Sequence, residues 1–178
     1  MDSFIITPKV DETQEFIEIA NDFSNPLDLV REAISNSYDA GASEIKISFE
    51  VIKQYGESIL KITLKDNGSG MTSGNLQNFF DLGNSTRRDD ETTIGEKGHG
   101  TKVYFNSNRI EVKTSRDGSG LLAIMEEPFK KLFDRQIPTV DVSFIEGVDI
   151  GTEITIYGYN NNRRDKFTHP ILKDYINL

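Results

Sequence analysis

The sequence predicts an α+β domain built as a two-layer sandwich. Two helical patterns fall within residues 13–40, strand patterns joined by short turns fill much of the remainder, and no internal repeat or low-complexity segment interrupts them. The 178 residues suit a single core, because single cores commonly hold about one to two hundred residues. We therefore expect one domain over residues 1–178.

The early helices are predicted from apolar spacing and capping chemistry. Residues 13–23 carry apolar side chains at near-helical intervals. Asn25 offers an N-cap and Pro26 suits the first helical position, so a second helix is expected to run to about Ala40. Two further helices are expected at residues 72–82 and 101–106.

Alternating apolar and polar residues predict the strands. The expected strand ranges are 44–51, 60–64, 109–114, 121–125, 139–144 and 151–157. Tight turns are expected at residues 54–57 and at Asp117-Gly118. The tail, about residues 160–178, begins polar and ends in a short apolar pattern, which indicates the start of a helix and leaves open a further domain beyond it.

Charge and composition exclude several classes of partner. With 20 Lys and Arg against 29 Asp and Glu the net charge is −9, which argues against nucleic acid, although backbone amides or a metal ion can still bind a small anion. No apolar run approaches the roughly 20 residues of a membrane span, and the N-terminus lacks a secretory signal pattern. With no cysteine, we expect a cytoplasmic protein without disulfides or thiolate metal sites.

Three polar side chains of the second predicted helix lie along one edge of its core-facing side. At about 100° per residue, Glu32, Asn36 and Asp39 fall within roughly 60° of one another, beside an apolar arc. A solvated helix face is the ordinary interpretation of such residues. Their place next to the apolar arc favours a site that combines carboxylates with a carboxamide.

Asp66 ends a strand on its apolar side, so its carboxylate should point inward and require hydrogen bonds. It precedes Gly68, Gly70 and Met71, and the two glycines allow a close backbone approach. Taken alone, this segment also suits an ordinary turn.

A second glycine segment, residues 95–100, precedes a predicted helix. Free amides at such a position can bind phosphate oxygens, and Lys97 and Lys102 add positive charge. The spacing is neither a Walker A loop nor a Rossmann fingerprint, and a plain surface loop is the alternative. Gly151-Thr152 opens a late strand and is uninformative alone.

Taken in order, these motifs resemble those of the GHKL ATPases, which include DNA gyrase B subunits, MutL-like repair proteins, the ninety-kilodalton heat-shock chaperone and sensor histidine kinases. The resemblance spans residues 25–157; residues 35–42 are similar to the MutL and Microrchidia versions, and residues 95–102 to the chaperone and Microrchidia form. It implies a Bergerat-type ATP-binding fold, with a mixed, mainly antiparallel sheet and helices on one face.

The resemblance also implies roles. Glu32 would be the catalytic base for water, Asn36 the Mg²⁺ ligand, and Asp66 the acceptor for the adenine amine, while residues 83–100 would form a lid. The implied nucleotide-binding residues are Asn36, Asp39, Asp66, Gly68, Gly70, Met71, Phe80, Ser85, Thr86, Lys97, Gly98, His99, Gly100, Thr101, Lys102 and Thr152.

We therefore expect ATP and Mg²⁺ as ligands and slow ATP hydrolysis that drives a conformational switch. In several relatives a lysine from a following domain reaches the terminal phosphate, and Lys97 or Lys102 could substitute for it here. A module that holds nucleotide without useful turnover remains open, as does a histidine kinase-type phosphotransferase. The partners implied are ATP or ADP, a second copy through nucleotide-dependent N-terminal contacts, and a further domain or protein.

Overall fold

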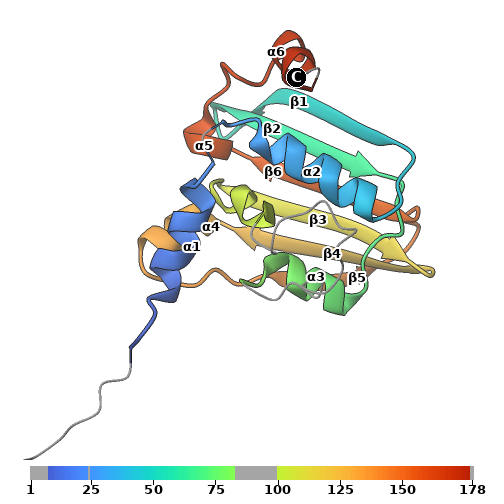
Figure 1. Ribbon diagram of the computed structural model, residues 1–178, viewed down its shortest axis with the longest axis horizontal. Helices are drawn as coiled ribbons and strands as arrows, with labels where there is room; N and C mark the ends of the chain where they lie inside the picture. The colour runs from blue at the N-terminus through green and yellow to red at the C-terminus, as the bar shows by residue number, and fades with distance from the viewer. Residues whose placement is uncertain (1–7, 24, 83–99, 177–178) are drawn as a thin grey trace, which may run out of the picture.

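The centre of the fold is a six-stranded sheet with the order β1-β2-β6-β3-β4-β5 (Figure 1). The computed structural model describes residues 8–23, 25–82 and 100–176. Its strands are β1 (Ile45–Gln54), β2 (Glu57–Asp66), β3 (Arg109–Arg116), β4 (Ser119–Glu126), β5 (Asp141–Ile145) and β6 (Gly151–Tyr157). Every pairing in the described ranges is antiparallel, which agrees with the mainly antiparallel sheet that we expected.

Helices pack around this sheet. They are α1 (Glu12–Asn21), α2 (Asp28–Asp39), α3 (Ser73–Phe80), the 3-10 helix η1 (Gly100–Phe105), α4 (Pro128–Phe133), α5 (Tyr159–Asn162) and α6 (His169–Ile176). In Figure 1, α2, η1 and α3 lie over one face of the sheet, so the predicted α+β sandwich of the Bergerat type is confirmed.

The register of the strands places the core in rows across the sheet. Two neighbouring rows are apolar and buried: Ile62, Ile156, Ile110 and Met125, then Leu64, Ile154, Val112 and Ala123. Because side chains alternate between the two faces of a sheet, the next row on the same face begins two residues further on. That row holds Asp66, Thr152 and Thr114, so polar groups begin where the apolar core ends.

Both predicted tight turns are present. Tyr55 and Gly56 have φ values of 50° and 84°, and Asp117 and Gly118 have φ values of 53° and 79°. Positive φ at both central residues is the geometry of two-residue hairpin turns that match the strand twist. The β1–β2 ladder continues to the turn, with Gln54 opposite Glu57, so these strands are longer than the alternation predicted.

Helix starts follow local capping chemistry with one shift. The side chain of Asp11 caps α1, and Thr72 with Asn75 forms a capping box at α3. Asn25 accepts a hydrogen bond from the Leu27 amide at 3.0 Å, as an N-cap would, but α2 begins only at Asp28. The prediction that Pro26 is the first helical residue is therefore wrong, because residues 25–27 form a separate turn.

Further differences from the expected elements are local. The predicted helix over 101–106 is a 3-10 helix, and the short helices α4 and α5 were not predicted. Within the described ranges, the structure has no helix of the length and apolar content that a membrane crossing requires.

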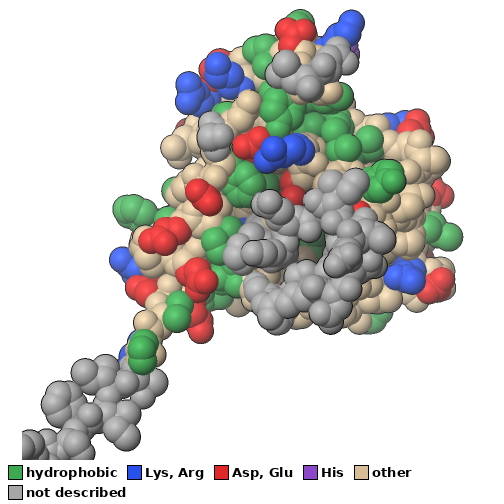
Figure 2. Space-filling model, viewed as in Figure 1, with side chains coloured by type: hydrophobic (Ala, Val, Ile, Leu, Met, Phe, Trp, Pro, Cys, Tyr) green, Lys and Arg blue, Asp and Glu red, His purple; other side chains and the backbone are tan. Residues whose placement is uncertain are grey.

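Acidic side chains gather over α1, among them Glu12 and Glu15 (Figure 2).

Candidate functional site

Helix α2 presents a hydrogen-bonded pair of polar side chains. Leu29, Val30 and Ala33 are buried and set the rotation of the helix, which leaves Glu32 and Asn36 half-buried at the edge of its packed side. The Asn36 side-chain nitrogen Nδ2 donates to Glu32 Oε1 at 2.7 Å. This contact is the expected neighbour relation of residues four apart on a helix. The structure thus places Glu32 and Asn36 side by side, as their helical spacing predicted, and their roles in a site stay predictions.

Asp39, the third member of the predicted cluster, is the last residue of α2 and is also half-buried. It therefore lies two turns from Glu32 on the same helix, at about 3.6 residues per turn.

The first residue of η1, Gly100, lies against the side chain of Glu32. A Cβ added at Gly100 would overlap the Glu32 carboxylate, with Oε2 as the nearest atom. Glu32 Oε1 thus accepts from Asn36 while Oε2 faces the Gly100 backbone. The carboxylate is held between two elements that are far apart in the sequence.

Asp66, at the end of β2, is half-buried and its carboxylate contacts α2, in keeping with the inward direction that we predicted. Ser37 Oγ donates to Asp66 Oδ2 at 3.2 Å, and the Gly68 amide donates to Asp66 Oδ1 at 2.8 Å. An ionised carboxylate has about four acceptor positions, so these two bonds leave capacity for a further donor. The role of Ser37 was missed because its buried position depends on how α2 packs on β2.

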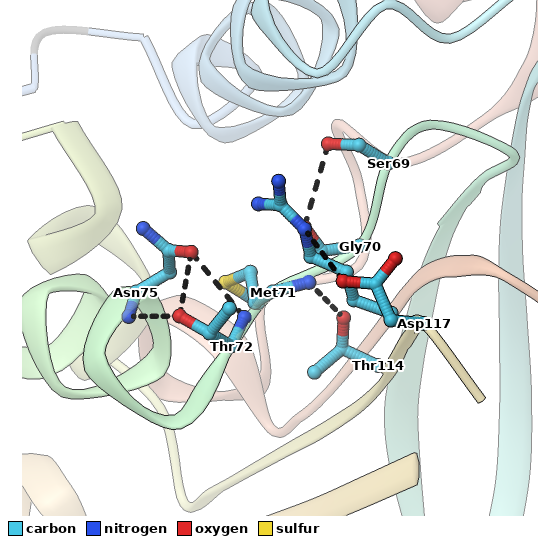
Figure 3. Close-up of polar contacts among 8 residues, drawn as sticks. Ser69, Gly70, Met71, Thr72, Asn75, Thr114 and Asp117 are labelled. Atoms are coloured by element: carbon cyan, nitrogen blue, oxygen red, sulfur yellow. Dashed lines mark hydrogen bonds and ion pairs between the residues drawn. The ribbon is translucent and has the colours of Figure 1, made fainter. Parts of the chain in front are cut away.

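Thr114 of β3 connects the remaining motifs and was not predicted. The Met71 amide donates to Thr114 Oγ1 at 2.8 Å (Figure 3), and Thr114 Oγ1 lies 3.0 Å from the Gly151 carbonyl oxygen and 3.1 Å from Thr152 Oγ1. Thr114 is fully buried. Thr114 follows Ile110 and Val112 at alternate positions of β3, a pattern that could have predicted its inward direction. Its partners, however, depend on the register between strands.

Gly70 holds the segment after Asp66 against β3. Its φ is +68°, and a Cβ there would overlap the Ser115 carbonyl oxygen. Only glycine fits such an approach without moving the strand. The close approach expected from the glycines is therefore made, at Gly70, to the chain's own backbone. At Gly68, an added Cβ would lie 2.8 Å from the Cβ of Ala40 at the end of α2.

Thr101 and Lys102 bind helix α3 in this structure. Thr101 Oγ1 donates to the Phe79 carbonyl oxygen at 2.7 Å, and Lys102 Nζ donates to the same oxygen at 2.9 Å. Lys102 is fully buried, and burial lowers its pKa to about 8, while the carboxylates of Asp81 and Glu32 act in the opposite direction. The predicted phosphate ligand is thus an inward-facing lysine.

Phe80 is also part of the core. It is buried and packs edge to face on Phe79, with ring centroids 4.9 Å apart, and its ring lies 6.3 Å from that of Phe105. The structure therefore brings Phe80 against η1, and its predicted contact with nucleotide stays a prediction.

Several predicted site residues lie outside the described residues: Ser85, Thr86, Lys97, Gly98 and His99, with most of the segment 83–100. Their roles stay predictions. Within the described ranges, no group of three or more His, Asp or Glu side chains is arranged to hold a metal ion.

Helix α2 thus carries the Glu32–Asn36 pair and, through Ser37, contacts Asp66 at the end of β2, where a polar row of the sheet begins. The chain belongs to the family of histidine kinase-, DNA gyrase B-, and HSP90-like ATPases, whose sequence model matches residues 25–127. Membership identifies it as an ATP-binding domain of the GHKL type, as the motifs indicated.

Among curated proteins, the chain is similar to DNA mismatch repair proteins MutL. The MutL of Deinococcus radiodurans is 29% identical over 99 residues, which are 51% of this chain and 17% of that protein. The MutL of Thermosipho africanus is 32% identical over 108 residues, 54% of this chain and 17% of that protein. The MutL of Rhodopseudomonas palustris is 32% identical over 98 residues, 52% of this chain and 16% of that protein.

Among solved structures, the N-terminal domain of a DNA repair protein superimposes with a TM-score of 0.52 at 19% identity. The match covers 93% of this chain and 43% of that one. At this identity the likeness concerns the fold alone. The chain spans only a minor part of the length of each of these proteins.

Proposed function

We propose that the domain binds ATP together with Mg²⁺, hydrolyses it slowly to ADP and phosphate, and thereby acts as a nucleotide-gated conformational switch. The observation that carries the proposal is the Glu32–Asn36 pair, bonded at 2.7 Å and turned toward Gly100, on the helix whose Ser37 also binds Asp66. One helix thus carries a candidate water base and a candidate metal ligand, and its Ser37 contacts a candidate base-reading carboxylate on β2.

The residues fit adenine at the Asp66 end. An ionised carboxylate only accepts hydrogen bonds, so Asp66 suits a base with an exocyclic amine and disfavours guanine, whose oxygen would face it. Ser37 and the Gly68 amide fix both carboxylate oxygens. Met71 and Thr152, tied together through Thr114, support the same end of the sheet.

The residues also fit Mg²⁺ with a single protein ligand. The carbonyl oxygen Oδ1 of Asn36 is the atom that can bind a cation, while the amide nitrogen Nδ2 donates to Glu32. Magnesium commonly keeps several waters and takes its other ligands from substrate phosphates, so a single amide oxygen is a sufficient protein contribution. When bound, the ion would supply charge neutralisation at the phosphates.

The hydrolytic step requires little from the protein beyond position and one base. A water oxygen forms the new bond to the terminal phosphorus, its proton passes to the Glu32 carboxylate, and the bond to the ADP oxygen breaks. The Asn36 amide fixes one carboxylate oxygen and the Gly100 backbone borders the other, which restricts the carboxylate to one orientation.

A second function is favoured by one observation. Lys102, a candidate cation for the terminal phosphate, is buried and bonded to Phe79. A site with few cations at the terminal phosphate would hold nucleotide without useful turnover and would control a protein partner by occupancy alone.

Calorimetric titration of the purified chain with ATP, ADP and GTP, with and without Mg²⁺, tests the proposal, and phosphate release under the same conditions separates the two functions. We expect Mg²⁺-dependent binding of ATP, weak binding of GTP and slow phosphate release. Binding without release supports the nucleotide-holding module, and absence of ATP binding contradicts both.

A further inference from the structure

Lys102 is a fully buried lysine in the described core. It lies on η1 with none of its side chain exposed. Burial of an ammonium group costs several kcal/mol unless hydrogen bonds compensate. Its Nζ donates to the Phe79 carbonyl oxygen at 2.9 Å and to Thr101 Oγ1 at 3.0 Å. Lys102 therefore occupies an internal position that supplies hydrogen-bond acceptors for its ammonium group.

These bonds join η1 to the end of α3. Phe79 lies in the last turn of α3, where carbonyl oxygens lack helical partners and the helix dipole favours a positive charge. Thr101 Oγ1 donates to the same carbonyl oxygen at 2.7 Å. Two consecutive residues of η1 thus bind one backbone atom of α3.

The same lysine interacts electrostatically with Glu32. Carboxylates that act on its ammonium come from two elements, Asp81 directly after α3 and Glu32 on α2. Gly100, two residues before Lys102 on η1, is the residue whose backbone borders the Glu32 carboxylate. Any displacement of η1 therefore moves both the positive charge and the backbone that face Glu32.

We infer that Lys102 is a positioning residue for Glu32 and not a ligand of the nucleotide phosphates. The inference rests on the proposed function, in which Glu32 acts on water. The ammonium of Lys102 anchors η1 to the Phe79 carbonyl, which keeps Gly100 against the Glu32 carboxylate and places a positive charge near it. Small misplacements of a reacting group can cost about 10²-fold in rate. We therefore expect loss of this anchoring to lower turnover much more than it lowers nucleotide affinity.

Hydrogen exchange of the nucleotide-free chain tests the anchoring without reference to ATP. Lys102→Met keeps the length and apolar character of the side chain but removes the ammonium. We expect amide exchange in η1 and at the end of α3 to rise by about tenfold or more, with β3 and β4 unchanged. The control is Lys53→Met, an exposed lysine bonded to Ser58 at 2.7 Å. Unchanged exchange in η1 would overturn the inference.

Thr101→Val provides a second variant should Lys102→Met not fold. It retains the ammonium but removes the hydroxyl that contacts both Phe79 and Lys102. We expect the same pattern of exchange with a smaller increase, and an exchange pattern identical to the parent would count against the anchoring.

Turnover and affinity then separate positioning from phosphate binding. We expect Lys102→Met to lower kcat at saturating ATP by about tenfold or more, with the Kd values for ATP and ADP changed alike and by less than about threefold. A Kd for ATP that rises much more than the Kd for ADP would overturn the inference, because it would identify a phosphate ligand. An unchanged kcat would also overturn it. A parent chain that neither binds nor hydrolyses ATP would refute the proposed function, whereas the exchange experiment would still report on the anchoring.

Discussion

The backbone of Gly100 lies against the carboxylate of Glu32, so closely that a Cβ at residue 100 would overlap it. Gly100 begins η1 and Glu32 lies in the middle of α2, so the contact joins two elements that meet only in the folded chain. With Asn36 bonded to the other carboxylate oxygen, the orientation of Glu32 is fixed from two sides.

Gly100→Ala tests this contact. The new methyl group must displace either the carboxylate or η1, so we expect ATP turnover to fall by about tenfold or more. Gly74→Ala in α3 is the matched control, because the nearest atom to its added Cβ is Thr72 Oγ1 at 3.9 Å. Phosphate release by the two folded variants is the measurement. Parent-like turnover in Gly100→Ala would show that the contact has no part in catalysis.

Asp66→Asn tests the reading of the base. The amide places a donor where Ser37 Oγ and the Gly68 amide now donate, and where the adenine amine would bind. We expect ATP affinity to fall by about tenfold or more, with a modest loss of about 1–3 kcal/mol in the free energy of unfolding. Calorimetric titration with ATP and GTP checks this, and Asp117→Asn in an exposed turn is the control. Unchanged ATP affinity in a folded variant would remove Asp66 from the site.

Asn36→Ala tests the metal ligand. If Asn36 acts through Mg²⁺, its loss should weaken ATP binding in the presence of the ion much more than in its absence. Paired titrations with Mg²⁺ and with a chelator make the comparison. Equal losses under both conditions would mean that Asn36 serves only to orient Glu32, to which it donates at 2.7 Å.

Lys102 gives the free energy of unfolding a specific pH dependence. Its pKa falls from 10.5 to about 8 on folding because the side chain is buried. Between these values the unfolded chain binds more protons, so the contribution of Lys102 to the free energy of unfolding rises with pH. Below about pH 8 the lysine is charged in both states and the cost of burying the ammonium is fully present.

Urea denaturation of the parent and of Lys102→Met checks this dependence. The parent should gain stability relative to the variant between about pH 7.5 and pH 9.5. Other groups titrate over the same range, and the comparison cancels their contribution. A difference between the two proteins that does not change with pH would show that the folded pKa of Lys102 is not lowered.

The elements with strong periodicity were predictable. Leu60, Ile62 and Leu64 alternate in β2 and form the buried face of that strand, and the tight turn at Asp117-Gly118 has the expected backbone geometry. These features depend on residues close together in sequence. Helix α4, with six residues, is too short for a periodic pattern, although Pro128 at its start was a usable signal.

The contacts that complete the site were not predictable. Thr114 contacts Met71 and Thr152 only because β3 pairs with β6 in one register. Lys102 beside glycines suggests a phosphate ligand, yet its partner is a carbonyl oxygen of α3, and no local pattern identifies that partner. In both cases tertiary packing, and not the local sequence, selects the contact.

The proposed role of Glu32 as the base of a slow ATPase is tested by the turnover of Glu32 variants. ATP turnover would be measured with Mg²⁺ for the parent, Glu32→Ala and Glu32→Gln, with Glu15→Ala on the exposed side of α1 as the control. A positioned base contributes about 10²–10⁴ in rate, so we predict at least about a tenfold loss of kcat in both Glu32 variants with ATP affinity retained. Turnover by Glu32→Ala and Glu32→Gln at the parent rate would contradict the role of Glu32 as the catalytic base.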